Sequence, residues 1–142
     1  MPRAERGHRA LPHTADVILE AWAPDFGACC EEAISALIAV CIDGSTADIV
    51  GEHVLYVPRA SSLDSMLLEI LDELIFILDT AATLPVRAEA EQQDDGGLKI
   101  RLLMALREAV RSTGSVPKGV ARSELTVECG PNRVRCAFLV DV

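Results

Sequence analysis

The segment His13-Thr14-Ala15-Asp16 places an imidazole and a carboxylate three residues apart. Such groups can act together as acid and base in catalysis. An Asp before a strand is also a common turn or capping residue, and a single His is commonly structural. No nucleophile, arginine clamp or second base accompanies the two side chains at a telling spacing. The segment alone therefore leaves both interpretations open.

Other motifs that carry chemistry are missing. The five cysteines form an odd set without a CxxC pair, which favours reduced thiols in a cytosolic compartment and does not favour a zinc site. We expect most of them to pack in the core like small apolar side chains. The chain also has no GxGxxG or GxxxxGK[ST] motif, so nucleotide binding by the usual glycine-rich loops is excluded.

The charge of the chain excludes further classes. With 22 acidic and 13 basic side chains the net charge is -9, so phosphate backbones are repelled and direct nucleic-acid binding is not expected. The longest apolar stretches, residues 36–42 and 74–78, are shorter than the roughly 20 residues that span a bilayer. The first residues lack the apolar core of a signal peptide. We therefore expect a cytoplasmic protein without membrane contact.

The elements that must position these residues fit one domain over residues 1–142, in which residues 1–10 need not be ordered. Residues 16–22 predict a strand between two prolines. Apolar residues at steps of three and four predict a helix that is capped by Asp25 and ends near Gly44. A second strand is predicted over residues 47–57. A second helix, capped by Ser61 or Ser62, has an apolar stripe that extends to Leu78.

The second half of the chain predicts four strands. Residues 86–91 and 98–104 form one pair around Asp94-Asp95-Gly96-Gly97, and residues 124–129 and 134–140 form another around Gly130-Pro131-Asn132. Residues 111–118 have no periodic pattern and predict an exposed loop. The order of elements predicts an α+β fold in which two helices pack on one mostly antiparallel sheet, a two-layer sandwich.

Three features together resemble the archease family over nearly the whole length. They are the tetrapeptide His13-Thr14-Ala15-Asp16, the acidic and apolar run from Met66 to Thr80, and a last strand that closes on Asp141 and an aliphatic residue. The sequence departs from the family pattern at Ile70, where Trp is usual, and at Ala121 and Ser123, which replace Thr and His.

The resemblance implies an accessory protein and not a catalyst. Such a protein promotes guanylylation and turnover of a GTP-dependent tRNA-splicing RNA ligase, and we expect it to be a monomer or a weak oligomer. Carried over by position, Asp16, Asp141 and a main-chain or terminal oxygen of Val142 would bind a divalent cation, Ca²⁺ or Mg²⁺, both of which prefer oxygen ligands. His13 and Lys118 would contact the partner.

Two other functions stay open. In one, the domain is a small metal-assisted hydrolase in which Asp16 and His13 act as acid and base. In the other, it is a chaperone-like interaction module that binds no metal.

Overall fold

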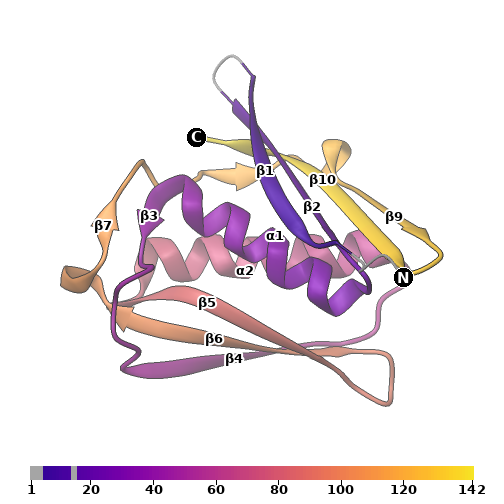
Figure 1. The fold of residues 1–142 in the computed structure, drawn as a ribbon, viewed down its shortest axis with the longest axis horizontal. Helices are drawn as coiled ribbons and strands as arrows, with labels where there is room; N and C mark the ends of the chain where they lie inside the picture. The colour runs from indigo at the N-terminus through magenta and orange to yellow at the C-terminus, as the bar shows by residue number, and fades with distance from the viewer. Residues whose placement is uncertain (1–4, 14–15) are drawn as a thin grey trace.

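The two helices lie between two antiparallel sheets in the computed structural model, which describes residues 5–13 and 16–142 (Figure 1). Helix α1 (Phe26–Cys41) contacts both sheets. Helix α2 (Leu63–Thr80) lies beside α1 and also touches strands of both. The helices therefore share their apolar faces with a sheet on either side, and the main core fills the space between.

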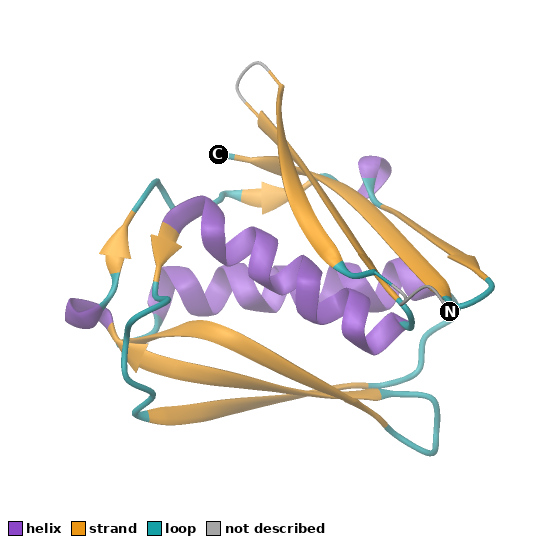
Figure 2. Cartoon of the chain, in the orientation of Figure 1, coloured by secondary structure: helices purple, strands orange, loops and turns teal. Residues whose placement is uncertain are grey.

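The first sheet is built around two long strands. Its order is β1 (Gly7–His13), β2 (Asp16–Ala23), β10 (Arg133–Asp141) and β8 (Gly119–Val120), and β9 (Thr126–Gly130) pairs with the other end of β10. Buried and exposed residues alternate along β10, as expected for a strand with one face on the core. The strands of this sheet come from both ends of the described chain (Figure 2).

The second sheet has three strands in the order β4 (Gly51–Val57), β6 (Leu98–Leu106) and β5 (Thr83–Gln92). The turn between β5 and β6 contains Gly96 at a φ of 89°, a left-handed conformation that glycine adopts without a steric penalty. A separate pair is formed by β3 (Ile42–Asp43) and β7 (Arg111–Ser112). Short 3-10 helices occupy Arg107–Ala109 and Arg122–Glu124.

Both helices begin at the caps that the sequence offers. The Asp25 carboxylate accepts a hydrogen bond from the Ala28 backbone N–H at 2.8 Å. The Ser62 hydroxyl accepts one from the Ser65 backbone N–H at 3.1 Å. Each cap satisfies a backbone donor that the first turn leaves without a partner. The prediction of Asp25 as a cap is confirmed, and Ser62, rather than Ser61, caps α2.

The predicted α+β class, with two helices and mostly antiparallel strands, is confirmed. The strands form two larger sheets, however, and not the one sheet of a two-layer sandwich. The reason is that hairpin signals specify which neighbours pair but not which third strand joins them. The hairpin of β5 and β6 takes up β4, whereas that of β9 and β10 takes up β2.

Strand β1 was not predicted from the sequence. It pairs with β2 along its whole length, so residues 7–10 belong to the sheet. The Arg6 side chain anchors this end of the chain through ion pairs with Glu31 and Glu32 of α1, at 3.1 and 2.5 Å. The strand was missed although it pairs with the next strand along the chain, because its residues do not alternate regularly between apolar and polar.

The segment predicted as an exposed loop, residues 111–118, is fixed at several points. Its first two residues form β7, and the Thr113 backbone N–H donates to the Cys41 carbonyl oxygen at 2.9 Å. The cysteines behave as predicted, because four of the five are buried and Cys129 alone is exposed. Burial raises the pKa of the Cys30 and Cys41 thiols, which keeps them in the unreactive thiol form at neutral pH.

The Asp25 cap yields a stability prediction. Asp25→Ala should lower the free energy of unfolding by about 1 kcal/mol, because the first turn of α1 loses its side-chain acceptor. Asp25→Asn keeps an acceptor and should stay close to wild type. Urea unfolding followed by the fluorescence of Trp22, the single tryptophan, measures both. Equal losses in the two variants would contradict the hydrogen-bonding role.

Candidate acidic site at the end of the first sheet

Asp16 and Asp141 face each other across two neighbouring strands. Asp16 opens β2, Asp141 closes β10, and the antiparallel register pairs them directly. Directly opposed residues project from the same face of a sheet, with Cβ atoms about 4.5–5.5 Å apart. Since Val140 and Leu19 point into the core, the two aspartates lie on the face of the sheet turned away from the helices. The fold thus brings together carboxylates that lie far apart in the sequence.

The other predicted site residues fall on the same line across the sheet. His13 pairs with Asp16 from β1, and Gly119 pairs with Asp141 from β8. The side chain of His13 lies outside the described part of the structure, so only its backbone position is known. The backbone N–H of Lys118 donates to the Asp141 carbonyl oxygen at 2.7 Å. Val142 follows directly and is partly exposed.

The side chains available for a metal ion are few. Within residues 5–13 and 16–142, no three His, Cys, Asp or Glu side chains are grouped so that they could hold a metal. A cation bound here would have two carboxylates as side-chain ligands and would take its remaining oxygens from the main chain of Val142 and from water. Oxygen donors of this kind suit Ca²⁺ or Mg²⁺ and not zinc, which favours His and Cys.

The arginines on this face do not neutralise the two aspartates, because they are paired elsewhere. Glu20 of β2 forms ion pairs with Arg9 at 2.7 Å and with Arg135 at 3.2 Å. The hydrogen bond from Arg9, aided by the charge of Arg135, lowers the pKa of Glu20. The row between this cluster and the aspartates is apolar and contains Leu11, Ile18 and Leu139. The acidic pair is separated from the nearest arginines of its face by that row.

Space beside the acidic pair is open. A Cβ atom built on Gly119 would meet no atom within 4 Å, although this residue lies directly across from Asp141. Like charges directly opposite on neighbouring strands also repel each other. The site therefore combines an unfavourable concentration of negative charge with room for a ligand, which is the arrangement that a bound cation would stabilise.

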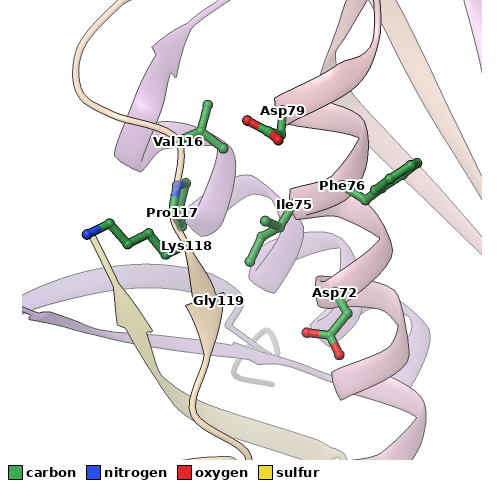
Figure 3. A pocket seen from close by; sticks show the side chains of 8 residues that line it. All are labelled: Asp72, Ile75, Phe76, Asp79, Val116, Pro117, Lys118 and Gly119. Carbon is green, nitrogen blue, oxygen red and sulfur yellow. The ribbon is translucent and has the colours of Figure 1, made fainter.

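A groove lies on the other side of Lys118. It has a volume of about 510 Å³ and is bounded by one face of α2 and by the segment that leads into β8 (Figure 3). The α2 wall contains Asp72, Ile75, Phe76 and Asp79, and the facing wall contains Val116, Pro117, Lys118 and Gly119. The same short segment thus borders both the acidic pair and the groove.

Residue patterns did not predict β8, although residues 118–123 resemble a strand of the family, and they did not predict the ion pairs of Glu20. A two-residue strand has no periodicity to detect, and the only signal for Glu20 is a charged residue within an otherwise apolar strand.

The three residues that depart from the family pattern lie in different surroundings. Ile70 is 1% exposed in the core, Ala121 donates its backbone N–H to the Leu139 carbonyl oxygen, and Ser123 is exposed.

These features define a class of small α+β domain in which two helices lie between antiparallel sheets and an acidic pair closes one end of the first sheet. Residues 8–142 match the model of the Archease protein family (MTH1598/TM1083). The chain belongs to the archease family. The proteins called "Probable protein archease" in two strains of Mycobacterium tuberculosis, CDC 1551 / Oshkosh and H37Rv, are each 33% identical to it, over 99% of this chain and 78% of theirs.

Solved structures show the same fold. The solution structure of Methanobacterium thermoautotrophicum protein 1598 superposes with a TM-score of 0.71 at 20% identity, covering 96% of this chain and 99% of that one. The crystal structure of a Thermotoga maritima archease, described as a possible chaperone, gives 0.68 at 18% identity and covers 94% and 96%. No helix in the described ranges combines the length and apolar character needed to cross a membrane.

The facing aspartates yield a second stability prediction. Asp141→Asn should raise the free energy of unfolding by about 0.5 kcal/mol in a chelator at low salt, because it removes the repulsion from Asp16. The gain should shrink at high salt, where the charges are screened. Urea unfolding measures the change, and Asp48→Asn, at an exposed loop position, is the matched control. A loss of stability in Asp141→Asn would contradict the repulsion.

Proposed function

We propose that this chain is an accessory protein that binds a divalent cation at Asp16 and Asp141 and promotes guanylylation and turnover of a GTP-dependent RNA ligase. The observation that carries the proposal is the pairing of Asp16 with Asp141 across β2 and β10. The family implies these two residues as cation ligands, and the register of the sheet independently makes them neighbours. Membership of the archease family supports the accessory role.

The residues of the site have distinct tasks in this proposal. The two carboxylates and a main-chain oxygen of Val142 hold the cation, which supplies a positive centre for oxygen atoms of the partner. The Lys118 backbone fixes β8 against Asp141 at 2.7 Å and so sets the edge of the site. The Lys118 and His13 side chains contact the ligase. Arg9 and Arg135 stay paired with Glu20 and leave the aspartates to the cation.

An interaction role also agrees with what is said of a relative. The Thermotoga maritima archease is described as a possible chaperone, a protein that acts by binding another protein. The cation would then act by joining two proteins or by being passed to the partner.

Cation binding is testable without the ligase. Millimolar Ca²⁺ or Mg²⁺ should raise the melting temperature, because a ligand at 100 times its Kd stabilises a folded protein by about 2.7 kcal/mol. Asp16→Ala and Asp141→Ala should abolish the shift in melting temperature. Calorimetry on these two variants should show no heat of Ca²⁺ or Mg²⁺ binding. Asp48→Ala, which removes an exposed carboxylate elsewhere, should respond like wild type. An equal shift in all variants would refute the site.

The accessory role needs its own assay. Adding the protein to the RNA ligase of the same organism, with GTP and metal, should accelerate ligase guanylylation and permit multiple turnovers. Asp16→Ala should remove the stimulation because the cation is no longer held, and Lys118→Ala should weaken it. Unchanged guanylylation on addition of wild-type protein would overturn the proposed function, and full stimulation by Asp16→Ala would overturn the role of the cation.

A further inference from the structure

The groove between α2 and residues 116–119 has apolar residues on both sides and acidic residues on its α2 wall. Ile75 contacts the core and is partly buried, and Val116 and Pro117 face the helix across the groove. The carboxylates of Asp72 and Asp79 extend toward the groove in Figure 3. The Lys118 side chain extends away from α2 in the same view, so its charge is not directed at these carboxylates.

The α2 residues of the groove share one face of the helix. Asp72, Ile75, Phe76 and Asp79 follow the spacing i, i+3, i+4 and i+7, which places them in one row. Phe76 is 61% exposed, although a phenylalanine side chain stabilises a folded protein mainly when it is buried. In Figure 3 the Phe76 ring extends from α2 away from residues 116–119, so it forms an exposed apolar edge of the groove beside the two carboxylates.

The acidic residues of α2 form no ion pairs within the described part of the chain. The helix carries five acidic and no basic residues, and none of the five forms an ion pair within 4.0 Å. By contrast, Glu31 and Glu32 of α1 both pair with Arg6. Asp79 also lies in the last turn of α2, where the helix dipole disfavours an anion.

The surroundings of Asp72 point the same way. Burial raises the pKa of its carboxyl group, and the charge of Arg122 acts in the opposite direction. Arg122 nevertheless makes no ion pair with it. A partly desolvated carboxylate that has no counter-ion is stabilised when a cation approaches it.

We propose that this groove is a docking site for a basic segment of a protein partner, which inserts an apolar side chain over Ile75 and Phe76 between two cationic side chains. Seven helical residues span about 10 Å, so no single side chain reaches both Asp72 and Asp79. The partner therefore supplies two cations about 10 Å apart. On a partner helix these are positions i and i+7, with the apolar side chain at i+3 or i+4.

The shape of the groove favours a protein segment over a small molecule. Small-ligand sites enclose most of the ligand surface and present a few convergent polar groups. This groove has only two walls, its polar groups on α2 are of one sign, and Phe76 stands open to solvent. Charged surfaces of this kind complement a basic partner and speed its association.

The inference deepens the proposed function and rests on it, because the segment before β8 joins the groove to the acidic pair. Lys118 lines the groove, and its backbone holds Asp141. A ligase that reaches the cation at Asp16 and Asp141 would therefore place a neighbouring basic segment along α2.

The test is a binding titration with the RNA ligase of the same organism. The Kd for the ligase should rise at least about tenfold in the double variant Asp72→Asn/Asp79→Asn and about tenfold in Phe76→Ala. The Kd of the double variant should also change less with salt concentration than that of the wild-type protein. The double variant should melt at or above the wild-type temperature, because it relieves repulsion along α2. Its response to Ca²⁺ or Mg²⁺ should be unchanged.

The matched control is Glu69→Gln/Glu73→Gln, which removes two charges from the same helix outside the groove and should change the Kd less than about twofold. Equal weakening in both double variants would overturn the groove in favour of a general charge effect. Wild-type affinity in Asp72→Asn/Asp79→Asn would overturn it too. If the wild-type protein does not bind the ligase, both the proposed function and the groove inference fail. Equal weakening in both double variants, or wild-type affinity in Asp72→Asn/Asp79→Asn, would overturn only the groove inference and leave the proposed function intact.

Discussion

Eight consecutive residue pairs join β2 to β10 in antiparallel register, and that register decides which side chains lie on each face of the first sheet. On the inner face it packs Leu19 and Ala21 beside Phe138 and Cys136, all at most 1% exposed. On the outer face it opposes Asp16 and Asp141. Because side chains alternate along a strand, a slip of one residue would expose the core row and bury the aspartates. Burial of the apolar row therefore holds the charged row in place, and the repulsion between the two carboxylates is tolerated because the core favours this register.

Local signals in the sequence account for the helices and turns. Periodic apolar residues and the Asp25 cap locate α1, and the stripe up to Leu78 locates α2, because each depends on neighbours within a few residues. The turn at Gly96 is likewise set by a residue that tolerates positive φ. The strand pairings between hairpins depend on contacts across the whole chain, so the division into two sheets could not be predicted. Strand β1 pairs locally with β2 but lacks a regular apolar pattern, and β8 is too short to show one. The resemblance joined Asp16 to Asp141, and only the register explains why they are neighbours.

Carboxylates in this structure fall into two groups with different consequences. Glu20, Glu31 and Glu32 are held by arginines from elsewhere in the chain. Arg9 and Arg135 connect β1 and β10 to β2, and Arg6, which precedes β1, connects the start of the described chain to α1. These pairs use up basic residues on the outer face of the first sheet. Asp72 and Asp79 on α2 have no such counter-ion among the described residues, and neither do the opposed aspartates. The carboxylates of the acidic pair and of α2 thus remain free for an outside cation, whereas those paired with arginines connect elements of the fold.

The separation of Asp16 from Asp141 along the chain has a consequence for synthesis on the ribosome. Strand β2 is made early, yet it has no partner on its β10 side until residues 133–141 have left the exit tunnel. Until then the first sheet consists of the hairpin of β1 and β2, with one edge exposed and half of the core beneath it incomplete. The acidic site and the closed core therefore form in the same event. A nascent or truncated chain that ends before β10 would lack both, so only the finished chain presents the paired carboxylates.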